Sequence, residues 1–374
     1  MEGKTTMRAI RTGTSLGHAE LLDDVPIPSA LTTLAQHPAH VLLKPSYVGI
    51  NPCDYLFTDL EIMFAPGMTI GCEYAGEVIE VGSAVTIGLK KGDRIAGLAM
   101  PSAGPQPNAG TFAEYVLVKG DAALRLEEMG DAISEAESAG VNVALATVCY
   151  AFYHLMGLPL PVVDPGLEPL LLGNNITRTS ERTILIYGGS TTTGLMAIQW
   201  AKLSGMLVIT TCSAANFELV KKMGADHAFD YHDAKVCAER IRKVTDGHLR
   251  LVFDCVGAFA SPQICADAMA LDGGGCLYNS LSPTPFTRQD VKSIFTGGEA
   301  VLGEARRVRG ELIPGDEELF KAYRDFLRLS QHLFRVGKIR APPTEIVHGM
   351  ENILDVMDDL RKWNIRGKKM VARI

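Results

Sequence analysis

The amino-acid sequence predicts an α/β protein that combines a β-rich region with a doubly wound parallel sheet. Strand-like and helix-like segments alternate between residues 183 and 280, and this alternation is typical of consecutive βαβ units. The segment before residue 150 instead contains short runs of Val, Ile, Leu and Tyr that are separated by turn residues. The length of 374 residues predicts two or three domains, each large enough to bury its own core.

The N-terminal region is predicted to contain strands at 41–48, 74–81, 95–97 and 112–118. An Ala-rich helix is predicted over 134–156, because Glu135 and Glu137 near its start favour a helix N-terminus.

A segment rich in Pro, Gly and Asn follows this helix and extends to about residue 182. It is long for a loop inside one compact domain, so we place a domain boundary or a surface insertion there.

The alternating region is predicted to hold five strands and four helices. The strands are 183–187, 207–211, 228–230, 251–254 and 276–280, and the helices are 192–204, 217–223, 234–245 and 262–270. The alternation ends after residue 303, and two amphipathic helices are predicted beyond it, at 317–336 and 350–362.

Composition excludes several classes of protein. The net charge of −7 argues against nucleic-acid binding, and we interpret the short basic runs 306–309 and 366–369 as solvated surface or a local phosphate contact. No segment approaches the roughly 20 apolar residues of a membrane span, and no signal peptide is recognised, so a cytoplasmic protein is expected. The eight cysteines form no C-x-x-C pair, which argues against structural zinc.

The segment from Thr183 to Gly194 predicts a dinucleotide site. A strand of β-branched and apolar residues runs into Gly188-Gly189-Ser190, three threonines follow, and an apolar helix begins. Small residues let the backbone approach a pyrophosphate, and the N–H groups at the helix start face its charge. The alternative is that Gly188 and Gly189 only serve a tight strand-to-helix connection.

This turn departs from the common G-x-G-x-x-G pattern because Thr residues follow Ser190. The hydroxyl groups of Ser190, Thr191, Thr192 and Thr193 are therefore expected to donate to phosphate oxygens in addition to the backbone.

The end of the next strand favours NADPH over NADH. An NAD site usually carries Asp or Glu there, whereas this strand continues into Cys212, Ser213, Ala214, Ala215 and Asn216. Ser213 and Asn216 can donate to a 2′-phosphate. We expect Tyr231, and Lys221 or Lys222, to close over it.

Six segments carry a family resemblance over nearly the whole chain. They are Ile50-Asn51-Pro52-Cys53-Asp54-Tyr55, Gly71-Cys72-Glu73-Tyr74-Ala75-Gly76-Glu77-Val78, Lys91-Gly92-Asp93-Arg94-Ile95, Gly110-Thr111-Phe112-Ala113-Glu114-Tyr115, Lys222-Met223-Gly224-Ala225-Asp226 and Phe253-Asp254-Cys255-Val256-Gly257. The sequence thus resembles the medium-chain dehydrogenase/reductase superfamily. The resemblance implies a GroES-like catalytic domain at 1–150 and 305–374 and a Rossmann NADP-binding domain at 151–304.

The resemblance points to the zinc-free branch. In zinc-dependent members the catalytic cysteine would fall near Asn51, and the histidine would fall at Cys72. Cys53, Cys72 and Glu73 offer possible ligands, but Cys53 is out of register. We therefore expect no metal, and without a Lewis acid we expect reduction of a conjugated C=C bond rather than alcohol oxidation.

Within that branch the chain looks like the stand-alone trans-acting enoyl reductases of fungal polyketide pathways. The resemblance lies in the segment 154–161 with the long segment after it, the turn at 187–190, and 212–217. It implies an NADPH-dependent monomer that reduces an α,β-unsaturated thioester. The thioester is held on the carrier protein of a polyketide synthase or of a synthase–nonribosomal peptide synthetase hybrid.

The resemblance also assigns site residues. The residues near the nicotinamide are Asn51, Pro52, Cys53 and Asp54. The residues at the pyrophosphate are Ser190, Thr191, Thr192 and Thr193. The residues at the adenosine phosphate are Ser213, Ala214, Ala215, Asn216 and Tyr231. Leu281, Ser282, Ile365 and Arg366 complete the cofactor cleft, and Thr147, Val148, Ala300 and Val301 contact the polyketide chain. Leu56 stands where related enzymes often have Lys.

Thr147 is the candidate catalytic donor to the enolate oxygen, and the alternative is a hydroxyl bonded to its own helix. Cys53, Tyr55 or water could protonate the α-carbon. Two other functions stay open. One is a zinc-free quinone or alkenal reductase acting on free small molecules, and the other is a non-catalytic NADPH-binding protein.

Overall fold

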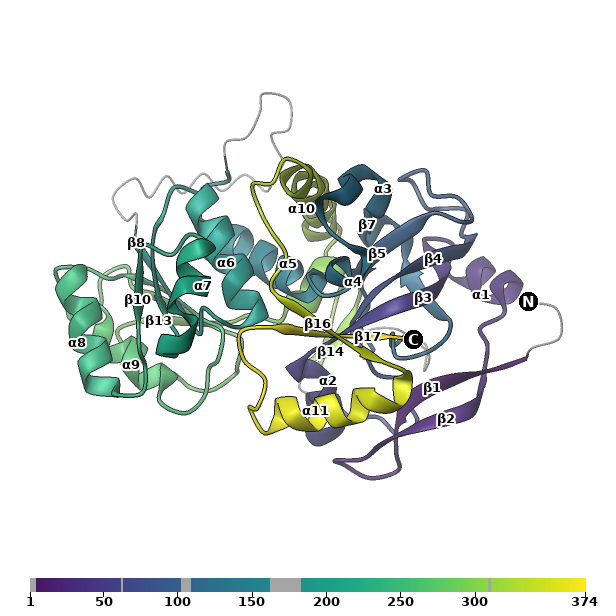
Figure 1. The fold of residues 1–374 in the computed structure, drawn as a ribbon, viewed down its shortest axis with the longest axis horizontal. Coiled ribbons are helices and arrows are strands. Elements are labelled where there is room, and N and C mark those ends of the chain that lie inside the picture. Colours follow the sequence, from purple (N-terminus) through teal and green to yellow (C-terminus); the bar gives the residue numbers. More distant parts are fainter. Residues whose placement is uncertain (1–4, 62, 102–108, 162–182, 309–310) are drawn as a thin grey trace. The chain divides into compact units, whose positions relative to one another are not determined.

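The computed structural model describes residues 5–61, 63–101, 109–161, 183–308 and 311–374 (Figure 1). The chain divides into two compact units. The first unit contains Met1–Val143 and Glu299–Ile374, and the second contains Ala144–Gly298. The predicted boundaries near residues 150 and 305 lie a few residues later in the chain. Most of the predicted connector, 162–182, lies outside the described residues.

The first unit is built on a seven-stranded sheet within its described residues. The strand order is β16-β17-β3-β4-β5-β7, and β6 pairs with β3. The bounds are β3 (His40–Ile50), β4 (Glu73–Val81), β5 (Arg94–Leu98), β6 (Val116–Lys119), β7 (Ala123–Arg125), β16 (Thr344–His348) and β17 (Lys369–Arg373). The C-terminal strand β17 pairs antiparallel with β3, so both ends of the chain build this sheet.

Most predicted strands of this unit lie inside observed ones, but the strand predicted over 112–118 is too long. Strand β6 begins only at Val116, and the preceding Ala113 forms an isolated bridge with Ala9. Apolar character alone does not separate a strand from an extended segment that touches another strand at one residue.

Further elements of the first unit surround this sheet. They are β1 (Thr6–Thr12), β2 (Ala19–Pro26), α1 (Ala30–Gln36), α2 (Pro52–Asp59), α3 (Leu126–Met129), α4 (Glu135–Ser138), β14 (Arg306–Val308), β15 (Glu311–Ile313), α10 (Glu317–Arg335) and α11 (Ile353–Arg361). The two C-terminal helices match their predictions, because each buries one apolar face. The basic run 306–309 falls partly on β14 and partly outside the described residues.

The single helix predicted over 134–156 is wrong. The segment forms α4, then α5 (Asn142–Val148), and then a π-helix at Cys149–Leu155. Between α4 and α5, Gly140 lies against Lys369, and a Cβ at Gly140 would stand 2.7 Å from Cγ of Lys369. A continuous helix is therefore interrupted where a distant, buried side chain needs the space.

The second unit contains a six-stranded parallel sheet in its described part. The order β10-β9-β8-β11-β12-β13 is 3-2-1-4-5-6 in chain order, which is that of a doubly wound dinucleotide fold. The bounds are β8 (Thr183–Tyr187), β9 (Leu207–Thr211), β10 (His227–Phe229), β11 (Leu251–Asp254), β12 (Leu277–Ser280), β13 (Lys292–Phe295), α6 (Thr192–Leu203), α7 (Phe217–Lys222), α8 (Ala234–Val244) and α9 (Ser261–Ala268). Figure 1 shows α6 and α7 on one side of the sheet and α8 and α9 on the other.

This sheet confirms the predicted fold class and nearly all its predicted elements. The sixth strand, β13, was not predicted, because its residues are mostly exposed and lie at the sheet edge. An edge strand with little buried surface lacks the apolar alternation on which strand prediction depends.

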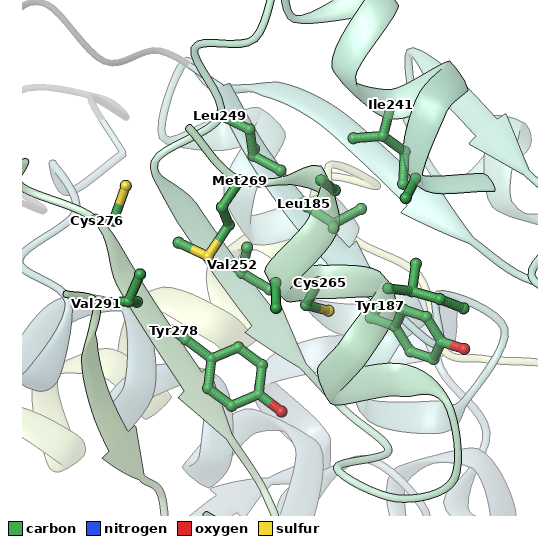
Figure 2. Close-up of a cluster of buried hydrophobic side chains, with 14 of the residues drawn as sticks. Leu185, Tyr187, Ile241, Leu249, Val252, Cys265, Met269, Cys276, Tyr278 and Val291 are labelled. Atoms are coloured by element: carbon green, nitrogen blue, oxygen red, sulfur yellow. The ribbon is translucent and has the colours of Figure 1, made fainter. Parts of the chain in front are cut away.

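The core of the second unit lies between the sheet and the helices α8 and α9. Figure 2 shows Leu185 and Val252 on the strand side and Ile241 and Cys265 on the helix side, pointing toward one another. Burying each such apolar side chain contributes roughly 1.5–3 kcal/mol. All eight cysteines are free, and Cys265 packs here as a small apolar residue.

In the described ranges, no helix combines the length and the apolar character that crossing a bilayer requires.

Candidate functional site

The turn after β8 brings three glycines into close contact. Gly188 has φ +78°, in the region that glycine adopts without a steric penalty. A Cβ at Gly189 would lie 1.9 Å from Oγ1 of Thr210, and one at Gly194 would lie 2.4 Å from the carbonyl oxygen of Gly188. The turn therefore closes so tightly that the backbone itself lines the start of α6.

Thr191 caps the helix that follows this turn. Its Oγ1 accepts from the N–H of Gly194 at 3.0 Å and donates to the carbonyl of Gly188 at 2.8 Å. Within the described residues, no hydrogen bond is found for the hydroxyls of Ser190, Thr192 and Thr193, which lie beside the first backbone N–H groups of α6. This is a cradle for an anion at the N-terminus of a helix of 12 residues.

The loop after β9 pairs two of the predicted donors. Nδ2 of Asn216 donates to Oγ of Ser213 at 3.1 Å, and Ala214 and Ala215 are exposed between them. Tyr231 stacks on His232 with ring centroids 4.5 Å apart. These residues follow β9 and β10, which are neighbours in the sheet.

An acid that the sequence analysis missed also lies at this loop. Asp230 follows β10, and its Oδ2 accepts from the N–H of Ala214 at 3.2 Å. Its Oδ1 accepts from the N–H of His232 at 2.9 Å, and this hydrogen bond is the main cause that lowers the pKa of Asp230. The ends of neighbouring parallel strands meet at one sheet edge, so an acid that follows the third strand lies beside the loop that follows the second.

The two lysines expected to close over the phosphate lie at the far end of the helix that follows this loop. Lys221 and Lys222 occupy the last turn of α7, whereas Ser213 precedes its first turn. Lys221 also pairs with Glu218, with 3.4 Å between Nζ and Oε1. The helix axis rises about 1.5 Å per residue, so the length of α7 separates these cations from the loop.

Leu281 and Ser282 follow β12 and are half-buried. A Cβ at Gly257, which has φ +59°, would stand 2.4 Å from Cβ of Ser282. Ends of β11 and β12 are thus held together at the same edge of the sheet as the glycine turn.

A buried ionic cluster lies at the start of α2 in the first unit. Nζ of Lys369 lies 2.5 Å from Oε2 of Glu73 and 2.5 Å from Oδ1 of Asn51. Nδ2 of Asn51 donates to the same Glu73 oxygen at 2.8 Å, and the N–H of Val143 donates to Oε1 at 2.6 Å. Glu73 is 0% exposed and Lys369 3% exposed, so each charge depends on the other.

Asp54 adds a second carboxyl group to this region. Its Oδ2 accepts from the N–H of Asn51 at 2.7 Å, whereas Oδ1 is buried and has no hydrogen-bond partner among the described residues. Burial is the main cause that raises the pKa of Asp54 to about 7. The group is therefore poised to exchange a proton near neutral pH.

Replacing Asp54 by Asn is expected to flatten the pH dependence of stability. A raised native pKa means that the folded protein binds a proton that the unfolded chain has lost, so stability falls as pH rises from about 4 to about 7. The effect is at most about 4 kcal/mol. Urea denaturation of both proteins from about pH 4 to about pH 8 measures the difference, because this range includes both the unfolded and the native pKa of Asp54. Parallel pH profiles for the two proteins would contradict the assignment.

Cys53 and Cys72 lie beside Asp54, with their Sγ atoms 3.6 Å apart. The ligand atoms of these three residues lie within 4.8 Å of one another, which raises the question of a metal. They do not fit the zinc of the superfamily. Asn51, at the expected cysteine position, is bonded to Glu73 and Lys369.

The charges around the thiols also disfavour a metal cation. The buried ammonium of Lys369 acts on both Cys53 and Asp54. The hydrogen bond with Cys53 and then burial raise the pKa of Cys72 well above its ordinary value, so Cys72 is a neutral thiol at this site at neutral pH.

Thr147 lies on α5 and is 4% exposed. No hydrogen bond to its hydroxyl is found among the described residues, so the alternative of a bond to its own helix is not observed. A Cβ at Gly298 would stand 2.7 Å from Oγ1 of Thr147, so glycine keeps the space beside the hydroxyl open. Val148, Ala300 and Val301 are at most 2% exposed.

Tyr55 is held by α11. The guanidinium of Arg361 lies 5.3 Å from the ring centroid of Tyr55 and also pairs with Asp59, with 2.8 Å between Nε and Oδ2. Burial is the main cause that raises the pKa of Tyr55, so the phenol keeps its proton at neutral pH. Ile365 and Arg366 follow α11 and precede β17.

Comparison with known proteins identifies two family models in the chain. Residues 37–128 match the alcohol dehydrogenase GroES-like domain, and residues 192–321 match the model described as zinc-binding dehydrogenase. The first match lies within the predicted β-rich region, and the second covers most of the alternating region and extends past residue 304.

Solved structures share this architecture. A mycobacterial protein in complex with NADPH matches with a TM-score of 0.70 and 20% identity, over 98% of this chain and 100% of that one. The CurK enoyl reductase matches with a TM-score of 0.70 and 15% identity, over 99% of both chains. At these identities the likeness establishes the fold alone.

Curated relatives are much more similar in sequence. The trans-enoyl reductase ACTTS2 of Alternaria alternata is 36% identical over 94% of this chain and 95% of its own length. The trans-enoyl reductase buaC of Petromyces alliaceus is 32% identical over 98% of this chain and 97% of its own length. The chain therefore belongs to the trans-enoyl reductases, an NAD(P)-binding branch of the medium-chain dehydrogenase/reductase superfamily.

Proposed function

We propose that this protein reduces the C=C bond of an α,β-unsaturated polyketide thioester with NADPH, while the carrier protein of a separate synthase holds the thioester. The observation that carries the proposal is the full-length similarity to proteins named trans-enoyl reductases. The partner would be a polyketide synthase or a hybrid of such a synthase with a nonribosomal peptide synthetase, and this chain would act as a monomer.

The glycine turn and the start of α6 suit the pyrophosphate of the cofactor. Backbone N–H groups and the hydroxyls of Ser190, Thr192 and Thr193 would donate to it, while Thr191 keeps the helix capped. When bound, NADPH supplies the hydride that adds to the β-carbon of the substrate. Asn51 to Asp54 would contact the nicotinamide end, and Leu281, Ser282, Ile365 and Arg366 would contribute further cofactor contacts.

Ser213 and Asn216 support a preference for NADPH. Their hydrogen-bonded side chains would donate to the 2′-phosphate beside Ala214, Ala215 and Tyr231. Asp230 adds a negative charge beside this loop, and the N–H groups of Ala214 and His232 that donate to its two oxygens offset part of that charge.

Replacing Ser213 by Asp is expected to weaken NADPH binding about ten- to a hundredfold and to change NADH binding little, because a carboxylate repels the phosphate. Fluorescence titration of both cofactors measures the two affinities. Ser213→Ala is the matched control, and it should lose only one hydrogen bond. A parallel loss for both cofactors in the Asp variant would mean that the 2′-phosphate lies elsewhere.

Thr147 would stabilise the enolate oxygen through its hydroxyl, which has no partner within the described residues and lies next to Gly298. Thr147→Val keeps the shape and removes the donor, so kcat is expected to fall about a hundredfold while NADPH affinity is unchanged. Thr147→Ser should keep most activity. Wild-type turnover in the Val variant would exclude this role.

Protonation of the α-carbon completes the reaction. Tyr55 keeps its proton at neutral pH, and Cys53 and solvent water are the other donors. We propose that no metal takes part, because Asn51 and Cys72 replace the family's zinc ligands and a buried ammonium lies beside them. Stoichiometric zinc in the active protein would contradict this.

The function itself is tested by the form of the substrate. NADPH oxidation is followed with a pantetheine-bound crotonyl thioester, the same acyl chain on a carrier protein, and a simple quinone. We expect the thioesters to be reduced much faster than the quinone. The reverse order would identify a quinone reductase, and NADPH binding without turnover of any acceptor would identify a binding protein.

A further inference from the structure

Two thiols far apart in the sequence meet at the start of α2. Cys53 is the second residue of this helix, and Cys72 immediately precedes β4. Their Sγ atoms are 3.6 Å apart, which is van der Waals contact between two sulfurs. A disulfide needs about 2.05 Å between its sulfurs, so the two Sγ atoms must approach by about 1.5 Å to form one.

Accessibility differs between the two thiols in a way that suits stepwise chemistry. Cys53 is half-buried, whereas Cys72 is 1% exposed. Cys149, Cys212, Cys237, Cys265 and Cys276 are each at most 2% exposed. Among the eight cysteines, only Cys53 and Cys255 are partly exposed as residues, and no thiol partner of Cys255 is found in the described part of the chain.

We infer that Cys53 and Cys72 form a modification site, a dithiol that a low-molecular-weight disulfide converts to an intramolecular disulfide. The thiolate of Cys53 attacks one sulfur of oxidised glutathione and releases one glutathione thiolate, which forms a mixed disulfide on Cys53. The thiol of Cys72 then loses its proton to solvent and attacks Sγ of Cys53, and the second glutathione leaves. Two protein thiols are oxidised, and one glutathione disulfide is reduced to two thiols.

The charges around Cys53 set the rate at which its thiolate attacks oxidised glutathione. The hydrogen bond with Cys72 favours the thiolate of Cys53, but burial and the carboxylates of Asp54 and Glu73 outweigh it, so the pKa of Cys53 is raised. Lys369 opposes these carboxylates. The reaction should therefore accelerate as the solution becomes more alkaline, since more thiolate is then present.

The test is disulfide mapping in the full-length protein as purified. The protein is incubated with oxidised glutathione, quenched with acid, alkylated and digested. No Lys or Arg lies between residues 53 and 72, so trypsin leaves both cysteines on one peptide. Cleavage at Glu61 separates them, and the expected product is a pair of peptides linked through Cys53 and Cys72 that dithiothreitol releases.

Matched variants separate this site from general thiol reactivity. Cys72→Ser should stop the reaction at a stable glutathione adduct on Cys53, and Cys255→Ser should leave the linked peptides unchanged. If a serine variant fails to fold, the disulfide map of the wild-type protein is sufficient to test the inference. A persistent adduct on Cys53 in the wild type, or free thiols at both positions while Cys255 reacts, would overturn the inference. Stoichiometric zinc that blocks the oxidation would overturn it as well.

Discussion

Replacing Lys369 by Met is expected to lower the free energy of unfolding by about 3–5 kcal/mol, because it leaves the buried carboxylate of Glu73 without its cation. Both side chains are at most 3% exposed, so water cannot take over the lost interaction. Asn51 also loses the donor on its Oδ1, which should displace the start of α2. Urea denaturation at neutral pH measures the change in stability.

Lys368 provides the matched control for this experiment. It is the preceding residue and pairs with Glu345, with 2.6 Å between Nζ and Oε2, but both side chains are exposed. Lys368→Met should therefore change the unfolding free energy by less than about 1 kcal/mol. The double variant Lys369→Met with Glu73→Gln should recover part of the loss, since the unpaired charge is removed. Equal losses of unfolding free energy in Lys368→Met and Lys369→Met would show that the pair of Lys369 and Glu73 is solvated.

Replacing Gly194 by Ala is expected to weaken NADPH binding by about tenfold or more and to lower the free energy of unfolding by roughly 1–3 kcal/mol. The new Cβ would lie 2.4 Å from the carbonyl oxygen of Gly188 and 2.7 Å from Cα of Gly189. Both neighbours are backbone atoms, so α6 must move away from the turn. The N–H groups that would hold the pyrophosphate move with it. Fluorescence titration with NADPH and urea denaturation give the two quantities.

Gly205, just beyond the other end of α6, is the control. It has φ +76°, and a Cβ there would meet no atom within 4 Å. Gly205→Ala should cost about 1 kcal/mol through the left-handed backbone alone and leave NADPH affinity unchanged. If Gly194→Ala bound NADPH as tightly as the wild type, the start of α6 would not be the phosphate site.

Local patterns explain why the doubly wound region was predicted well. The strand from Thr183 to Tyr187 is apolar and largely β-branched, and the glycines after it are required by the turn they form. Each of these signals depends on neighbours within a few residues. The amphipathic helix α10 was predicted correctly for the same reason. Strand β13 was missed because an exposed edge strand buries too little to leave a pattern.

The candidate site was only partly predictable. The segment Asn51 to Asp54 was singled out by resemblance, but Lys369 looked like part of a solvated basic run, and its partner Glu73 lies 296 residues away. Asp230 was passed over because the strand order that brings it to Ala214 is a property of the sheet. Local sequence patterns carry no information about contacts between residues that are so far apart in the chain.

The sequence by itself determined the parallel sheet, the glycine turn and the class of cofactor, because strand periodicity and backbone sterics act over a few residues. Only the tertiary structure decided that Lys369 is a buried counter-ion, that Asp54 carries a raised pKa and that Cys53 touches Cys72. Burial and charge pairing arise from surfaces that meet only after folding, and the pair of Lys369 and Glu73 joins residues 296 positions apart.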